Sequence, residues 1–318
     1  MIDSETGNHL WAERFDKPVA DLFDMQDEIV ARLANQLSAK LIEAEARHAE
    51  LTKSTDLDSL DLTFRGLAAF NRGLDPASIE QAEQFFNKAL ALDATNVDAL
   101  AGLGLKRSLS AIFHVHSSTS VDRTAYLAAA EDAAKKALRI SPRHTRARLA
   151  LATTFLATNR AAQSIVEFEE TIALDQNQAT AYAFIALAKV FLGRAEEIED
   201  DISHALRLSP RDTYTYYWFN IAGVAKLALG RDDEAIGWFR RSTDANRNHA
   251  LNHFFLSAAL AHQGQTTEAA MAAKAGLELE PTFTIRRYRE GAVTDNATYL
   301  AQRERFYEGM RIAGVPEG

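Results

Sequence analysis

The chain has 318 residues, of which 47% are hydrophobic and 25% are charged, and its formal net charge is −9. This usage is typical of a globular protein and excludes wholesale disorder, and a content of 15 Gly and 6 Pro favours helices over a turn-rich β protein. The absence of Cys excludes disulfides, thiol nucleophiles and Cys-ligated metal sites.

Acidic residues gather near the N-terminus, where residues 1–62 hold 6 Lys or Arg and 14 Asp or Glu, a balance of −8. The remainder is close to neutral, so no basic domain is present to neutralise a phosphate backbone and we expect no nucleic-acid binding. Met1–Glu5 lack the basic and apolar regions of a secretory signal. The most apolar run, Ala179–Gly193, contains Lys189 and is shorter than the roughly 18 to 20 residues of a membrane span. We expect a cytoplasmic protein that does not enter a membrane.

The first 17 residues predict a β-hairpin, because the turn-forming cluster Glu5–Asn8 separates two short segments and Trp11 and Phe15 fall on alternate positions. A lone hairpin is marginally stable in water. It is therefore either the end of a sheet whose other strands come from elsewhere or a hairpin packed on the helix that follows.

A long helix is predicted over roughly Val19 to Thr52. Apolar residues three or four apart form one stripe along it, which must be buried against the hairpin or the first repeat. The stripe consists of Leu22, Met25, Ile29, Leu33, Leu37 and Leu41.

A period of about 34 residues organises the rest of the chain, and such a period indicates a repeat architecture. We place the extra residues of the second repeat in a loop around His114–Ser120 and those of the fifth near Leu229–Asp232. The closing positions are Ala94, Pro142, Gln176, Pro210, Arg247 and Pro281, at intervals of 48, 34, 34, 37 and 34.

Residues five positions before the closing position are all small, and those eight positions before it are all apolar. In a helical hairpin repeat, small residues let neighbouring helices approach closely, large ones fill the gaps, and Pro ends the second helix. Five residues before it stand Ala89, Ala137, Thr171, Ala205, Ser242 and Gly276, and eight before it stand Phe86, Ala134, Phe168, Ile202, Phe239 and Ala273.

This pattern resembles the tetratricopeptide repeat, a pair of antiparallel helices with small residues at fixed positions and a closing Pro, although Ala94, Gln176 and Arg247 replace that Pro. The resemblance implies an all-α fold, an α-solenoid of about six helical hairpins in a right-handed superhelix. It divides the chain into an N-terminal part over 1–62, the repeats over 63–282 and a cap over 283–318. A last amphipathic helix of the cap carries Tyr299, Arg303, Phe306 and Met310.

The resemblance also implies that the first helix of each repeat lines a concave groove. The residues at the groove positions make it apolar and aromatic, and because Leu149, Thr153 and Ala183 are not the Lys and Asn that would clamp an acidic chaperone tail, we expect no such clamp. It would suit a peptide partner unless tight curvature or the N-terminal helix covers it. The partner contacts we predict are Leu187, Phe191, Tyr214, Tyr217 and Phe254. The other groove positions of the third to sixth repeats are Arg146, Leu149, Thr153, Leu156, Ala157, Thr180, Ala183, Val190, Ile221, Val224, Ala225, Leu251, Ala258, Ala261 and His262.

Sequence motifs of catalysis are missing. No Gly-rich phosphate loop and no Gly-x-Ser-x-Gly motif occurs. His249 and His253 are spaced for one helix face but lack a third ligand, and His114 and His116 stand in the insertion. Acidic pairs such as Glu196–Glu197 mark helix starts or exposed faces. We expect no enzyme activity, no cofactor and no metal.

The segments Ile2–Asp16 and Leu22–Ile29 resemble a junction in bacterial multidomain regulators, in which a class III adenylate cyclase or winged-helix domain precedes tetratricopeptide repeats. No residue here matches the cyclase metal ligands or a recognition helix. The sequence therefore predicts a non-catalytic scaffold that binds a protein or peptide, in bacterial signalling. The alternatives are the regulatory segment of a cyclase-type enzyme and a homo-oligomerisation module built on the N-terminal hairpin and helix.

Overall fold

The computed structural model describes residues 58–73, 76–113 and 123–318, together with helical positions 30, 33, 37 and 40–47. The β-hairpin predicted over residues 1–17 and the insertion at 114–120 lie outside the described residues. The described residues are helices joined by short turns, and they contain no strand.

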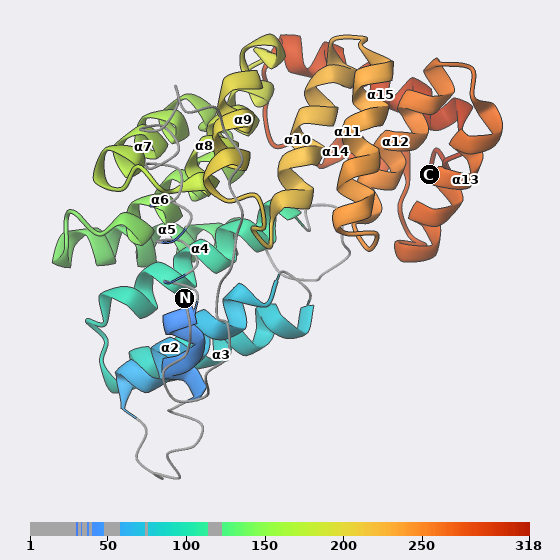
Figure 1. Ribbon diagram of the computed structural model, residues 1–318. Helices are drawn as coiled ribbons and strands as arrows, with labels where there is room; N and C mark the ends of the chain where they lie inside the picture. Colours follow the sequence, from blue (N-terminus) through green and yellow to red (C-terminus); the bar gives the residue numbers. More distant parts are fainter. Residues whose placement is uncertain are drawn as a thin grey trace.

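Six consecutive helix pairs form a curved array, shown in Figure 1. The two helices of a pair pack against each other, and most pairs pack against the next. The pairs are α2 (Ser59–Asn71) with α3 (Pro76–Leu92), α4 (Val97–Phe113) with α5 (Arg123–Ile140), α6 (Thr145–Ala157) with α7 (Ala161–Leu174), α8 (Ala179–Phe191) with α9 (Glu199–Leu208), α10 (Thr215–Ala228) with α11 (Asp232–Ala245), and α12 (Ala250–His262) with α13 (Thr266–Leu279). A 3₁₀ turn, η2 (Ala195–Glu197), precedes α9.

The small and large positions of the repeat are buried as the sequence predicts. Ala89, Ala137 and Ala205 have no exposed surface, and the rings of Phe86, Phe168 and Phe239 are equally enclosed. At the small position of the sixth repeat, a Cβ on Gly276 would lie 2.7 Å from the Phe254 ring. The repeat pattern thus records helix packing, because only small residues let these rings approach the neighbouring backbone.

The turn between the two helices of a pair falls at one fixed place in the third to sixth repeats, 17 residues before the closing position. Its residue has a positive φ each time: Asn159 at 58°, Gly193 at 73°, Gly230 at 71° and Gly264 at 72°. The turn at Gly230 is therefore regular, and the prediction of extra residues there was wrong. The insertion of the fifth repeat precedes its turn, chiefly in the connection that runs from α9 to the start of α10 at Thr215.

Repeats that lack the closing Pro end their second helix by another device. Asp93, Asp175 and Asn246 each stand one residue before the closing position. Their side-chain oxygens accept hydrogen bonds from the backbone N–H two residues later, at 2.8, 3.0 and 2.9 Å. Such a turn satisfies backbone groups that a continuing helix would otherwise use. The three degenerate repeats thereby keep the same geometry.

The described part of the N-terminal helix packs through a different face from the predicted one. Leu37 and Leu41 are 42% and 59% exposed, whereas Ile42 and Ala46 are buried. The predicted stripe is therefore wrong at its C-terminal end. Ile42 joins the main hydrophobic core together with Leu67 and Phe70 of the first repeat, so this end of the helix covers the array rather than extending from it.

The chain ends in a cap that folds back onto the array. After α14 (Ile285–Glu290), helix α15 (Ala297–Ile312) packs across the first helices of the last two pairs, α10 and α12. All four residues predicted for its apolar face are at most 4% exposed. Gly309 brings the two backbones together, since a Cβ there would lie 2.7 Å from the Cα and O atoms of Ala258.

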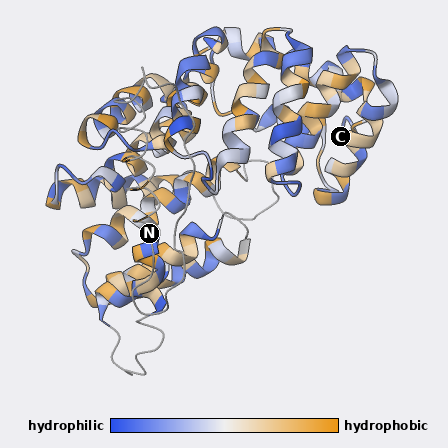
Figure 2. Cartoon of the chain, in the orientation of Figure 1, coloured by the Kyte–Doolittle hydropathy of each residue, from blue (hydrophilic) through white to orange (hydrophobic). Residues whose placement is uncertain are grey.

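Most helices of the array carry both hydrophobic and hydrophilic residues, as Figure 2 shows, whereas α8 is apolar and buried over most of its length. The mixed pattern is that of helices that bury one face and expose the other. Among the described helices, none is long and apolar enough to cross a membrane.

We predict that Gly309→Ala destabilises the protein by about 1–3 kcal/mol, because the added methyl group overpacks the crossing of α15 and α12. Urea unfolding measures the change. Gly237→Ala is the matched control, since nothing lies within 4 Å of its Cβ position and Ala is favoured over Gly inside a helix by about 0.5–1 kcal/mol. Equal stability of the two variants would contradict the close crossing.

Candidate functional site: a cavity inside the array

A cavity of about 660 Å³ lies on the inner side of the first five repeats. Its wall is made by the C-terminal end of α2, the middle of α4, the N-terminal ends of α6 and α8, the loop before α10, and the N-terminal helix at positions 42 and 43. Lining residues include Leu67, Phe70, Asn71, Leu105, Leu109, Arg143, His144, Thr145, Arg146, Leu149, Asn177, Gln178, Thr180, Arg211, Asp212 and Tyr214. A volume of this size is typical of ligand pockets.

The loop before α10 closes the cavity by touching the first repeat. The Tyr214 hydroxyl donates to the carbonyl oxygen of Phe70 at 3.3 Å, and the Thr213 hydroxyl donates to that of Asn71 at 3.4 Å. The Tyr214 ring lies 6.3 Å from the Phe70 ring and 6.1 Å from the Phe113 ring. This is the loop that contains the insertion of the fifth repeat, so the irregularity in the period has a structural role.

Helix N-termini contribute positive partial charges to the wall of the cavity, which Glu43 and Asp212 also line. The first residues of α6 and α8 and the loop entering α10 lie in it, and a helix N-terminus presents free N–H groups and a partial positive charge. The N-caps of α8 and α10, Gln178 and Tyr214, make no side-chain capping hydrogen bond. Arg143 and Arg211 add formal charges at the same wall.

Ion pairs fix part of this wall. Arg146 Nη1 donates to Asp98 Oδ1 at 2.9 Å, and His144 Nε2 lies 3.3 Å from the same oxygen. The hydrogen bond from His144, aided by Arg146, lowers the pKa of the Asp98 carboxyl group. Arg146 is thereby held at the N-terminus of α6, beside the cavity.

One carboxyl group lines the cavity from the inserted loop. Asp212 Oδ1 accepts from the backbone N–H of Tyr214 at 2.9 Å, and its Oδ2 accepts from the Ser209 hydroxyl at 3.3 Å. Burial raises the pKa of the Asp212 carboxyl group despite these hydrogen bonds. The carboxyl group therefore shapes the loop through its hydrogen bonds.

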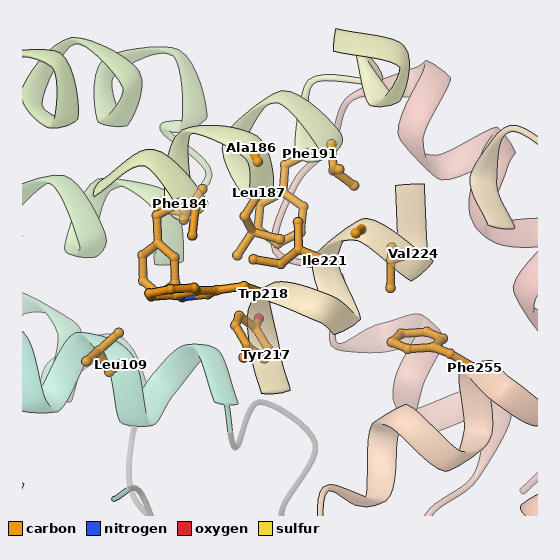
Figure 3. Close-up of a cluster of buried hydrophobic side chains, with 14 of the residues drawn as sticks. Leu109, Phe184, Ala186, Leu187, Phe191, Tyr217, Trp218, Ile221, Val224 and Phe255 are labelled. Atoms are coloured by element: carbon orange, nitrogen blue, oxygen red, sulfur yellow. The ribbon is translucent and has the colours of Figure 1, made fainter. Parts of the chain in front are cut away.

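The five predicted partner contacts do not lie together. Tyr214 lines the cavity of 660 Å³. Leu187, Phe191 and Tyr217 are buried and line a smaller cavity of about 70 Å³ under the cap. Phe254 is fully buried and stacks on Phe283 at 3.8 Å between ring centroids. Figure 3 shows Leu187, Phe191 and Tyr217 within one cluster of apolar side chains.

The cap separates these residues from Tyr214, because α15 packs against α10 and α12 and its Tyr299 reaches Phe191 at the end of α8. The Phe191 ring lies 5.4 Å from Tyr299, and His262 Nε2 hydrogen-bonds to the carbonyl oxygen of Arg305 at 2.8 Å. Arg305 also forms an ion pair with Asp232. The sequence predicts a C-terminal cap, but no pattern in it indicates that α15 packs back against the first helices of the repeats.

Four groove positions inferred from the resemblance, Arg146, Leu149, Thr180 and Tyr214, do line the large cavity. Sequence reasoning missed the connections that complete it, residues 141–144, 177–178 and 208–213, because it considered helix positions alone. The sequence did contain a sign of the loop before α10, because the interval between the closing positions Pro210 and Arg247 is 37 residues instead of 34.

The histidines considered as metal ligands serve packing and hydrogen bonding. His253 Nε2 hydrogen-bonds to the Arg247 carbonyl oxygen at 2.8 Å, and the His249 ring packs 5.3 Å from Tyr216. No group of three or more His, Asp or Glu is placed to hold a metal among the described residues. His114 and His116 lie outside that range.

Comparison with known proteins identifies the fold. No protein-family model matches the chain. The chain is similar to a tetratricopeptide-repeat protein of Thermus thermophilus, with 15% identity over 64% of this chain and 98% of that one and a TM-score of 0.50. It is also similar to the Cut9–Hcn1 hetero-tetramer of the APC/C, with 14% identity over 81% of this chain and 46% of that one and a TM-score of 0.62. The chain has the tetratricopeptide-repeat fold.

A curated relative is similar in sequence, the putative adenylate cyclase 3 of Rhizobium meliloti. It is 31% identical over 133 residues, which are 42% of this chain and 22% of that protein. The matched segment thus spans less than a quarter of the relative.

We predict that Tyr214→Ala loosens the contact between the first and fifth repeats, because it removes both ring contacts and the hydrogen bond to Phe70. Amide exchange at residues 69–73 should become about tenfold faster, which corresponds to about 1.4 kcal/mol of local stability. Tyr182→Ala, which removes a ring packed 4.2 Å from His204, serves as control and should leave residues 69–73 unchanged. Unchanged exchange in the Tyr214 variant would contradict the closure.

Proposed function

We propose that the chain is a non-catalytic scaffold that binds an extended peptide of a partner protein in the cavity of 660 Å³. The observation that carries this proposal is the cavity itself, which lies on the concave side of helical repeats and has a wall of mixed apolar and polar residues. Of the predicted contacts, Tyr214 would meet the peptide directly. The peptide would not contact the other four predicted residues while the cap stays packed against the repeats. These residues are Leu187, Phe191, Tyr217 and Phe254.

The chemistry of the wall suits the main chain of a peptide. The positive ends of the α6 and α8 dipoles and the Thr180 side chain would meet carbonyl oxygens of the peptide. Leu105, Leu109 and Leu149 offer an apolar floor for side chains. The site therefore combines the two elements that peptide recognition requires, a few placed polar groups over apolar surface.

A cavity-filling variant tests the peptide site. Peptides selected from a display library on the wild-type chain should bind Thr180→Trp at least about tenfold more weakly, because the indole fills space beside the start of α8. Thr267→Trp, at an exposed position of α13, should bind them as the wild type does. Fluorescence anisotropy measures the affinities. Equal affinity for Thr180→Trp, or no enriched peptide, would contradict the proposal.

A second candidate function follows from the Rhizobium relative, which is named as a putative adenylate cyclase. In this case the chain is the regulatory segment of a cyclase-type enzyme and acts when it is joined to a catalytic domain. The partial match supports this candidate, and so does the resemblance of the N-terminal segments to a regulator junction. Cytoplasmic signalling in a bacterium is the setting we propose for either function, and self-association through the N-terminal segment stays a further proposal.

The two candidates agree that the isolated chain has no cyclase activity. We predict no formation of cyclic AMP from ATP with Mg²⁺ or Mn²⁺ by the purified chain, measured by mass spectrometry against a boiled control. Turnover that rises in proportion to the concentration of the chain would overturn the scaffold proposal.

A further inference from the structure

A small cavity of about 70 Å³ lies where the cap meets the concave side of the repeats. Its repeat side comes mainly from α8, α10 and α12 and is mostly apolar, as Leu187, Ile221, Val224 and Phe255 in Figure 3 show, with Asn220 and Tyr217 as its polar members. Its cap side includes Val293, Tyr288, Tyr299 and Arg303. Protein interiors are otherwise close-packed, so a void of this size at an interface is a specific feature.

Arg303 carries the one formal charge among the described residues that line this cavity. The residue is 2% exposed. Its Nη2 donates to the carbonyl oxygen of Tyr288 at 2.6 Å, while its Nε has no hydrogen-bond partner. Within the described part of the chain, Arg303 forms no ion pair with a carboxylate.

Aromatic rings surround the guanidinium group. Its central carbon lies 4.2 Å from the centroid of the Tyr288 ring, 5.4 Å from that of Tyr307 and 5.7 Å from that of Tyr299. Ring faces attract a cation, by about 0.5–2 kcal/mol each. They carry no net charge, however, because burial raises the pKa of all three tyrosines and keeps their hydroxyl groups neutral.

The charge of Arg303 is therefore only partly compensated. An arginine does not lose its proton inside a protein, and a buried ion without a counter-charge costs several kcal/mol. An unpaired Nε–H beside an apolar cavity is the arrangement that an anion with a hydrophobic part would complete. The hydrophobic part of such an anion would meet Leu187, Ile221 and Val224, whose side chains offer no hydrogen bonds.

We propose that this cavity binds a short-chain aliphatic carboxylate of about two to four carbons, with the carboxylate on Arg303 and the alkyl chain against Leu187, Ile221 and Val224. The size agrees, since about 10–15 Å³ of accessible cavity volume holds one water molecule: the cavity of about 70 Å³ has room for about five such molecules, and a carboxylate of two to four carbons has four to six non-hydrogen atoms. The site is separate from the proposed peptide cavity and does not depend on it.

Such a ligand would join the two sides of an interface. Its alkyl chain would contact α8 and α10 of the repeats, and its carboxylate would contact α15 of the cap. A ligand that binds the docked cap stabilises the docked state by mass action. The carboxylate would therefore tighten the attachment of α15 to the groove.

Titration of the full chain with sodium acetate, propionate and butyrate tests the proposal, with sodium chloride at equal ionic strength as reference. Calorimetry should show one saturable site for at least one carboxylate, and the thermal midpoint should rise with that ligand and not with chloride. Val224→Leu narrows the cavity by one methylene group and leaves Arg303 in place, and Arg303→Met removes the charge. Each should weaken binding at least tenfold.

Arg311→Met on the same helix is the control, because Arg311 pairs with Glu317 outside the cavity, and it should bind as the wild type does. If Arg303→Met does not fold, Val224→Leu decides. Absence of saturable binding of all three carboxylates to the wild type would overturn the proposal, as would wild-type affinity in Val224→Leu. Thr180→Trp should retain carboxylate binding, so the experiments can contradict the peptide proposal and the carboxylate proposal separately.

Discussion

The close crossing of α15 over α12 determines how this solenoid can be used. Gly309 meets the backbone of Ala258, and the neighbouring contacts of Arg305 with His262 and Asp232 fix the crossing on both sides. Aromatic packing continues it, with Phe306 lying 5.7 Å from Phe255. A helix buried to this extent belongs to the core of the last three repeats and is not a loose lid.

This crossing divides the concave side into two parts with different chemistry. The C-terminal part is filled by the protein itself and keeps a small apolar cavity with one buried cation, Arg303. The N-terminal part is closed by the contact of Tyr214 with Phe70 and holds the large cavity, whose wall combines polar and apolar residues. A partner peptide and a small ligand would thus occupy separate places in one groove.

The repeat architecture could be predicted from the sequence because small residues such as Ala89 and large ones such as Phe86 recur at fixed spacing. Burial confirms that each is needed for helix packing. The candidate site could be predicted only in part. Tyr214 was found from its repeat position, but its contact with Phe70 spans 144 residues and depends on the curvature of the whole array. Local periodicity carries no information on such contacts, or on the return of α15 along the groove.

The position of α15 in the groove is the central claim, and nuclear Overhauser effects between selectively labelled aromatic rings test it most directly. The structure predicts cross-peaks between Phe306 and Phe255 and between Tyr299 and Phe191, whose ring centroids are 5.7 and 5.4 Å apart. Observation of both pairs in the free chain would support the divided groove. If neither pair appears while Phe168 and Phe184, 6.0 Å apart within the repeats, do give a cross-peak, α15 lies elsewhere and the account is contradicted.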